Sequence, residues 1–304
     1  MATRYPQGIL ISCEIPWDAD GTFLEDTFRD EVRAALKHGF RHVYIFGTAG
    51  EGYAVTLGQF DEIVRVFREE TLGDDVLPMV GVIGLSAPQV IERVAHAYDA
   101  GFRVFQISFP SWGTLDDVEY MTFFSDVCGS FTDARFLHYN LMRSGRVLTG
   151  PDYRRLVDEI PNLVATKNTT ADVRTIIDIA SKSPELQHFY GEAGFGHGCL
   201  VGECSLLSSF GPLFPRKTLE FFEYGVNGRW DKLFPMQAEY VAAIGAFLAP
   251  TRPRAAIDGA YDKMIVRASG IDMPIGLLPP YRGFDEETYQ ACVAAVREQF
   301  PDWD

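Results

Sequence analysis

The sequence predicts an α/β protein, a (β/α)8 TIM barrel with a C-terminal helical appendage. Its 304 residues, 47% of them hydrophobic, are enough to bury one large core. Short runs of β-branched and aromatic residues alternate with amphipathic stretches, which is the pattern of successive βα units on a parallel sheet. The strand pattern stops after eight such units, and helical periodicity alone continues toward the C-terminus.

The helices expected between the strands carry start and stop signals. In residues 26–39, Phe28 and Val32 lie on one apolar face and Gly39 ends the helix. Ser86 is expected to cap the next clear helical stretch. The eight expected strands occupy residues 8–16, 41–47, 76–83, 103–109, 135–140, 163–168, 188–193 and 203–209.

The seventh βα unit has the least helical composition, because its segment GFGHGCLVG (194–202) is short and rich in glycine. A doubly wound open sheet is the alternative fold. Such a sheet usually has a glycine-rich phosphate-binding turn after its first strand, and this sequence has none there. The barrel is therefore favoured.

The chain is expected to form a catalytic barrel over residues 1–228 and a helical extension over residues 229–304. No linker rich in Pro, Gly or Ser separates the two parts. The extension is therefore expected to pack against the barrel as one rigid body.

Charge and cysteine content exclude several classes of function. The chain has 27 Lys and Arg against 42 Asp and Glu, a formal net charge of −15, which opposes binding to nucleic acids and anionic membranes. Its five cysteines form no CxxC pair, so neither a disulfide framework nor a zinc ribbon is expected. No signal peptide or membrane-length apolar run is evident, and a cytoplasmic location is expected.

A TIM barrel builds its active site at the C-terminal ends of the strands. Lys167 ends the apolar run LVATK, where a confined barrel mouth would favour its neutral, nucleophilic amine. A lysine that reaches solvent and pairs with a carboxylate is the alternative. The residues at expected strand ends are Glu14, Thr48, Ala49, Trp112, Tyr139, Asn140, Lys167, Asn168, Gly191 and Glu192.

Two further features near these strand ends suit carbonyl chemistry. Tyr139 ends the strand before that of Lys167, and adjacent strands lie about 4.8 Å apart, so its phenol can move protons in the same cavity. The turn GTAGEG (47–52) offers backbone N–H groups and a hydroxyl that can hold a carboxylate. Glu51 in this turn is expected to brace the loop. A core-capping tyrosine and an ordinary tight turn are the alternatives.

With these motifs, the chain resembles the dihydrodipicolinate synthase/N-acetylneuraminate lyase family of pyruvate-dependent class I aldolases. GTAGEG resembles the family's GTTGE turn, HYNLMRSG (138–145) its strand-five Tyr-Asn motif, and LVATKNTT (163–170) the strand that ends in the imine-forming lysine. The separation between Tyr139 and Lys167, 167 − 139 = 28, is also the family's. The resemblance runs to about residue 228.

The resemblance implies roles for individual residues. Lys167 is expected to form the imine, Tyr139 to relay protons, and Thr48 and Ala49 to hold the substrate carboxylate. Gly191 is expected to line the pyruvate side with its backbone. The resemblance implies no metal and no organic cofactor, a small 2-oxo acid as substrate, and a homo-oligomer, either a tetramer or a dimer.

The sequence also departs from the family pattern. Ala49 replaces a threonine of the turn, and Trp112 replaces a tyrosine that in the synthases completes a hydroxyl relay with a neighbouring subunit. Arg143 resembles the arginine that receives the second substrate's carboxylate, and Arg146 competes for that role. Glu14 is expected either to face the cavity or to be solvated, and the sequence leaves both open.

The sequence therefore predicts a Schiff-base lyase or aldolase that acts on pyruvate or a 2-oxo acid by aldol cleavage, condensation or dehydration. The alternatives are a true 4-hydroxy-tetrahydrodipicolinate synthase and a non-catalytic ligand-binding or regulatory paralogue. A metal-dependent hydrolase would need His and Asp clusters at the strand ends, whereas His138 and His188 stand alone.

Overall fold

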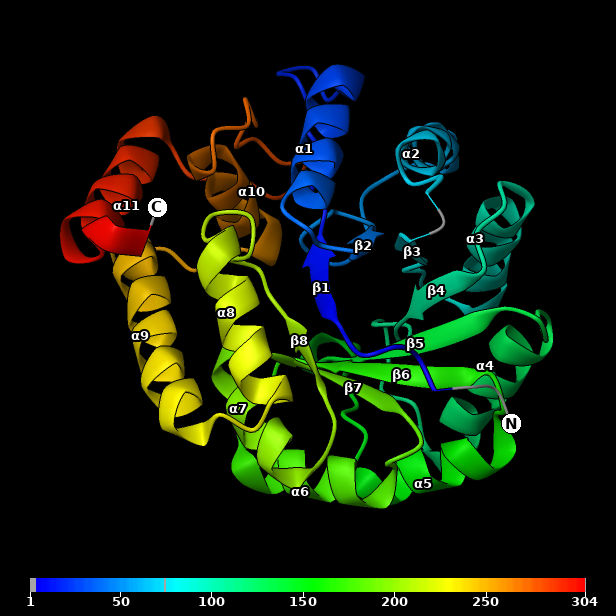
Figure 1. The fold of residues 1–304 in the computed structure, drawn as a ribbon. Helices are drawn as coiled ribbons and strands as arrows, with labels where there is room; N and C mark the ends of the chain where they lie inside the picture. Colours follow the sequence, from blue (N-terminus) through cyan, green and yellow to red (C-terminus); the bar gives the residue numbers. More distant parts are fainter. Residues whose placement is uncertain (1–3, 74, 304) are drawn as a thin grey trace.

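The computed structural model describes residues 4–73 and 75–303. Within this part of the chain, eight parallel strands follow one another in chain order and close into a barrel surrounded by helices (Figure 1). The predicted fold class is confirmed, and each predicted strand segment contains an observed strand. The strands are β1 (Ile9–Ser12), β2 (His42–Ile45), β3 (Leu77–Gly81), β4 (Val104–Ile107), β5 (Arg135–Asn140), β6 (Leu163–Asn168), β7 (Gln187–Gly191) and β8 (Ser205–Leu207).

A helix follows each strand, and its ends match the sequence signals. Gly39 has a φ of 94° just after the first helix, and the Ser86 side chain accepts a hydrogen bond from Gln89 N at the start of the third. The helices around the barrel are α1 (Glu25–Lys37), α2 (Leu57–Glu70), α3 (Ala87–Asp99), α4 (Asp117–Gly129), α5 (Gly150–Glu159), α6 (Val173–Lys182), α7 (Glu192–Val201) and α8 (Pro215–Val226).

Helix α7 forms despite its glycines, and its neighbours explain them. A side chain at Gly194 would collide with the Thr170 carbonyl oxygen, and one at Gly198 would collide with the Tyr190 ring. These glycines therefore let α7 lie close against the barrel wall. The same close packing makes the segment poor in helical sequence signals.

The core has two layers. Inward-facing side chains fill the barrel, and a larger apolar layer lies between the strands and the helices. Side chains alternate along each strand, so residues two apart share the inner face. The interior cluster consists of Tyr5, Leu10, Tyr44, Met79, Leu137, Val164, Ala165, Phe189 and Leu207.

Three helices follow the barrel: α9 (Trp230–Leu248), α10 (Asp258–Ala268) and α11 (Glu286–Gln299). Helix α9 contacts α7, α8 and α11, and Figure 1 shows α10 beside α1. The expected boundary near residue 228 falls between α8 and α9 and stays a prediction as a domain limit. In the described part of the chain, no helix is both long enough and apolar enough to cross a membrane.

A buried ion pair fastens α10 to the turn after β2. Glu51 Oε2 accepts hydrogen bonds from Lys263 Nζ at 2.5 Å and Trp17 Nε1 at 2.9 Å, and neither the Glu51 nor the Lys263 side chain is exposed. Glu51 Oε1 also accepts a hydrogen bond from the Leu278 backbone N–H at 2.7 Å. Glu51 therefore braces the turn against segments more than 200 residues away in the sequence.

Lys263→Ala should destabilise the protein by about 3–5 kcal/mol, because it leaves the Glu51 carboxylate buried without its counter-charge. Chemical denaturation monitored by circular dichroism measures the loss. Arg155→Ala is the matched control, since it removes an ion pair with Glu159 whose two side chains are 49% and 52% exposed, and it should cost less than about 1 kcal/mol. Equal small losses in both variants would contradict the bracing role.

Candidate active site

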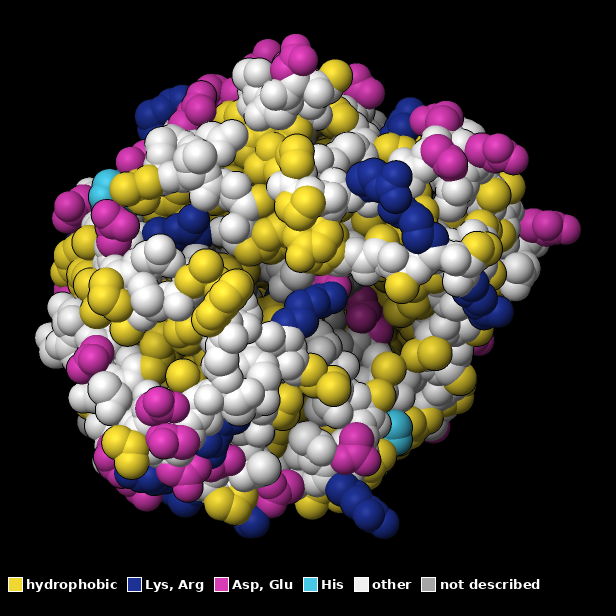
Figure 2. Space-filling model, turned by 180° about the vertical axis from the view of Figure 1, so that it is seen from behind, with side chains coloured by type: hydrophobic (Ala, Val, Ile, Leu, Met, Phe, Trp, Pro, Cys, Tyr) yellow, Lys and Arg dark blue, Asp and Glu magenta, His cyan; other side chains and the backbone are white. Residues whose placement is uncertain are grey.

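A cavity of ≈ 480 Å³ opens at the C-terminal ends of the strands. Figure 2 shows a face of the molecule that is hollowed near its centre, with basic and acidic side chains at the hollow. The walls of the cavity come from four strands, from the loops after β2, β5, β6 and β8, and from helix α10. The lining residues are Tyr44, Thr48, Ala49, Tyr139, Leu141, Met142, Arg143, Lys167, Thr169, Leu207, Ser209, Asp258 and Asp262.

Lys167 reaches this cavity from β6 and is only 4% exposed. Its Nζ donates a hydrogen bond to Tyr44 Oη at 2.7 Å, and it lies 4.0 Å from the centre of the Tyr139 ring. Burial lowers the pKa of Lys167 to about 8, and the nearby acidic groups only partly oppose this effect. About one amine in ten is then neutral at pH 7, against one in a few thousand for an ordinary lysine.

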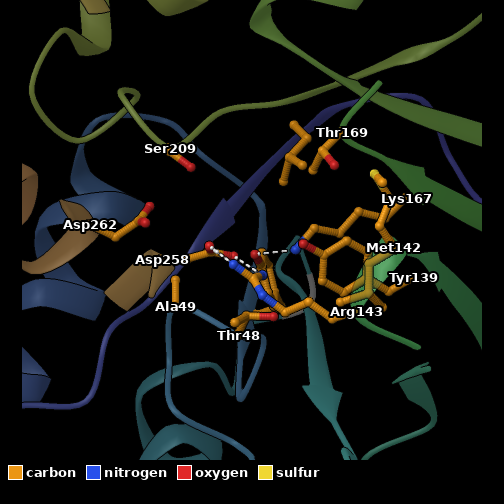
Figure 3. A pocket seen from close by; sticks show the side chains of 13 residues that line it. Thr48, Ala49, Tyr139, Met142, Arg143, Lys167, Thr169, Ser209, Asp258 and Asp262 are labelled. Carbon is orange, nitrogen blue, oxygen red and sulfur yellow. Dashed lines mark hydrogen bonds and ion pairs between the residues drawn. The ribbon is translucent and has the colours of Figure 1, made fainter. Parts of the chain in front are cut away.

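Tyr139 lies beside Lys167 because the two are register partners on β5 and β6. Burial raises the pKa of Tyr139, and Asp258 raises it further, while Arg143 and a hydrogen bond with Thr48 act in the opposite direction. The phenol therefore stays protonated at neutral pH and can both donate and accept a hydrogen bond. Figure 3 shows Lys167 and Tyr139 on the same side of the pocket.

The turn after β2 is held in an uncommon backbone conformation. Phe46 and Glu51 have positive φ angles of 59° and 53°, which side-chain-bearing residues rarely adopt. Gly52 must lack a side chain, because a Cβ there would overlap the Phe46 carbonyl oxygen. The turn thus places Thr48 and Ala49 in the cavity wall, and Glu51 braces it from behind.

Arg143 spans the cavity mouth and pairs with Asp258 of α10. Two hydrogen bonds of 2.7 and 3.0 Å join the guanidinium to the two carboxylate oxygens, a bidentate arrangement visible in Figure 3. Arg146 points elsewhere, toward Asp117 and the Leu115 carbonyl oxygen. Of the two competing arginines, the structure therefore brings only Arg143 to the cavity.

Sequence reasoning missed Tyr44, Ser209, Asp258 and Asp262. Asp258 and Asp262 are four residues apart on α10 and face the same cavity, a spacing that puts both on one helix face. Burial raises the pKa of Asp262 well above its usual value, and Glu14 raises it further. Asp262 is therefore expected to hold a proton at neutral pH. The inward-facing position of Tyr44 two residues before Phe46 was the available signal for it.

Four predicted substrate-binding residues do not line the cavity. Trp112 is 89% exposed on the loop after β4. Asn168 is buried in a network with Asn140 and Thr166 instead. Gly191 lies at the start of α7, outside the cavity wall. Glu14 is 1% exposed, so the solvated alternative for it is wrong, and it lies beneath the cavity rather than in its wall.

The two isolated histidines belong to the core. Burial lowers the pKa of His138 to about 3 and that of His188 to about 4. His138 hydrogen-bonds Tyr153 Oη, and His188 hydrogen-bonds Thr166 Oγ1. Within residues 4–73 and 75–303, no three His, Cys, Asp or Glu side chains are arranged to hold a metal ion.

Reaction with formaldehyde and cyanoborohydride should modify Lys167 at a rate that rises through pH 7 and levels off above about pH 8, because the pKa of its amine is about 8 and only the neutral amine reacts. Exposed Lys37 is the internal reference, since an ordinary lysine levels off only above about pH 10.4. Peptide mass mapping after short reactions at several pH values measures both sites. Coincident profiles would show that burial does not activate Lys167.

Comparison with known proteins identifies relatives of this architecture. The family model of the dihydrodipicolinate synthetase family matches residues 5–299, which extends past the part covered by the sequence motifs. An uncharacterised DapA-like lyase of Halobacterium salinarum is 23% identical over 297 residues, covering 96% of this chain and 93% of the relative. N-acetylneuraminate lyase 2 of Escherichia coli is 21% identical and covers 76% of each chain.

Solved structures show the same fold at lower identity. The Escherichia coli K12 prophage protein YagE, of the dihydrodipicolinic acid synthase family and solved with pyruvate, superposes with a TM-score of 0.87 at 19% identity, covering 96% of this chain and 98% of its own. CdNal of Clostridium difficile, solved with mannosamine, gives a TM-score of 0.85 at 16% identity, covering 97% of this chain and 99% of its own. On the family match over nearly its whole length, this chain belongs to the dihydrodipicolinate synthetase family.

Proposed function

We propose that this protein is a class I aldolase-type lyase that forms a Schiff base between Lys167 and pyruvate or another 2-oxo acid. One observation carries the proposal: a buried lysine amine of lowered pKa faces a cavity beside a protonated tyrosine. Family membership supports the coarser assignment, a lyase of the pyruvate-dependent aldolase type.

The expected chemistry follows from these positions. The neutral Lys167 amine attacks the 2-oxo carbon, and Tyr139 moves a proton to the carbonyl oxygen so that it can leave as water. Thr48 and the Ala49 backbone hold the carboxylate of the substrate. The protonated imine then accepts electrons from the C–C or C–O bond that is made or broken.

The charges around the cavity support a hydroxyl-rich second substrate, such as a sugar-derived aldehyde or a sugar acid. Arg143 is already paired with Asp258, so it is not free to receive a second carboxylate. Asp262 and Ser209 lie on the far wall and offer hydrogen bonds to hydroxyl groups. CdNal, a neighbour in fold, was solved with mannosamine, which is in keeping with this substrate class.

Two alternatives were considered. A true 4-hydroxy-tetrahydrodipicolinate synthase would need a free carboxylate receptor, which the Arg143–Asp258 pair disfavours. A non-catalytic paralogue would give no reason for a lysine of lowered pKa between Tyr44 and Tyr139. The aldolase or dehydratase reading accounts for both features.

We also propose a homo-oligomer, tetramer or dimer, in a reducing cytoplasmic compartment. Trp112 and Met142 are 89% and 85% exposed, and a hydrogen bond from Arg146 to the Leu115 carbonyl links the loops that carry them. Large apolar side chains exposed together favour a subunit contact. All five cysteines are free thiols, in keeping with a reducing compartment.

Pyruvate with borohydride should add one reduced pyruvyl group to the protein at Lys167, because reduction traps the imine on the lysine that forms it. Intact mass and peptide mapping locate the group. Lys167→Ala is the control and should take up none. An adduct that persists in this variant, or no adduct on the unaltered protein, would sink the mechanism.

Supplied with pyruvate and aspartate semialdehyde, the protein should show a kcat/KM below about 10⁴ M⁻¹s⁻¹, the low end of the ordinary range. The reason is that Asp258 occupies Arg143, the expected receptor for this aldehyde's carboxylate. Asp258→Asn frees the guanidinium and should raise that kcat/KM. A coupled assay measures both proteins, and ordinary turnover by the unaltered protein would refute the assignment.

A further inference from the structure

A line of polar side chains inside the barrel continues from Lys167 away from the cavity. On β1, the alternation that points Leu10 inward also points Ser12 inward, and Glu14 follows two residues later. Ser12 is the register partner of Tyr44 on β2, so the two side chains are neighbours on the inner face. Both Ser12 and Glu14 are buried, at 8% and 1% exposure.

Contacts connect these groups in sequence. Lys167 Nζ donates to Tyr44 Oη at 2.7 Å. The Ser12 hydroxyl interacts with the Tyr44 phenol on one side and the Glu14 carboxyl on the other, and it lowers the pKa of each. Ser12 Oγ and Glu14 Oε2 make no other hydrogen bond that would hold them in place. Four groups on β6, β2 and β1 therefore form one chain of exchangeable protons.

We propose that Tyr44, Ser12 and Glu14 form a proton relay for the Lys167 amine, with the Glu14 carboxylate as its proton store. The inference rests on the proposed imine chemistry and adds the route by which the buried amine loses and regains a proton. Because Glu14 does not line the cavity, it acts through Ser12 and Tyr44, and it is a positioning residue rather than a catalytic one.

The proton balance closes without any other reactant. The Lys167 ammonium gives a proton to Tyr44, whose own proton passes to Ser12, and the proton of Ser12 passes to Glu14, which leaves a neutral amine. The amine forms the N–C bond, and its second proton reaches the carbonyl oxygen through Tyr139. The proton stored on Glu14 then returns through Tyr44 to this hydroxyl, which leaves as water as the C=N bond forms.

The charges around Glu14 make this transfer nearly reversible. Burial raises the pKa of Glu14 to about 7, close to the value of about 8 for Lys167, so the two protonation states differ in population only by about tenfold. The charged and titratable groups that face Glu14 are Lys263 and Asp262 from α10, Glu51 from the turn after β2, Glu31 from α1, Lys167 from β6, Tyr44 from β2 and Cys13 beside it on the chain.

A relay and a simple charge effect predict opposite results. The Glu14 carboxylate raises the pKa of Lys167, so removing its charge alone would leave more neutral amine at pH 7 and speed imine formation. Removing the store of a relay would instead slow it. The sign of the change in rate therefore separates the two roles.

The test measures single-turnover imine formation with pyruvate and cyanoborohydride as a function of pH, on the full-length protein. Glu14→Gln should slow adduct formation at pH 7 by about 10²-fold, the lower end of a general acid–base contribution, and should remove the rise in rate near pH 7. Ser12→Ala should cause a similar loss, and Ser12→Thr, which keeps the hydroxyl, should restore the rate.

Glu31→Gln is the matched control. It replaces another buried carboxyl group, whose Oε1 accepts the Glu14 backbone N–H at 2.7 Å, and it should leave the rate near that of the unaltered protein. An unchanged or faster rate in Glu14→Gln overturns the relay. If Glu14→Gln fails to fold, an unchanged rate in Ser12→Ala overturns it. No adduct on the unaltered protein overturns the imine chemistry and the relay together, whereas a failure of the relay alone leaves the adduct in place.

Discussion

Exclusion of water from the barrel mouth is the constraint on which this site depends. Eight closed strands force alternate side chains into a confined interior, where a charge is costly unless it is paired or neutralised. Each polar group there meets that cost in its own way. Glu51 and Lys263 pair with each other, the pKa of Lys167 falls, and those of Glu14 and Asp262 rise. The same burial that makes these groups expensive to fold gives them protonation states useful near neutral pH.

The C-terminal helices are part of the site rather than an appendage to it. Helix α10 supplies Asp258 and Asp262 to the cavity, and its Lys263 holds Glu51 behind the turn that carries Thr48 and Ala49. One helix thus sets both the charge of the cavity mouth and the position of the carboxylate cradle. Variation in this helix would change substrate choice without disturbing the lysine, and this offers a physical basis for different activities on one barrel.

The Arg143–Asp258 pair illustrates how a motif residue can be present and yet occupied. The motif alone predicts a carboxylate receptor, because an arginine fork matches a carboxylate. In the structure, α10 already provides that carboxylate. The cavity mouth therefore presents a neutralised pair, and hydroxyl groups are the substrate features that its polar walls suit best.

The sequence by itself determined the fold class, all eight strands, the position of Lys167 beside Tyr139 and the cradle turn, because alternation, capping and strand-end position are local or nearly local properties. Tertiary structure decided the rest. It brought Asp258 and Asp262 across from a helix about 90 residues beyond Lys167, chose Arg143 over Arg146, buried Glu14 and left Trp112 exposed. Sequence periodicity can say that a side chain points inward. Which other inward-pointing groups it meets, and hence which protons it holds, depends on the register of strands and helices that only the closed barrel fixes.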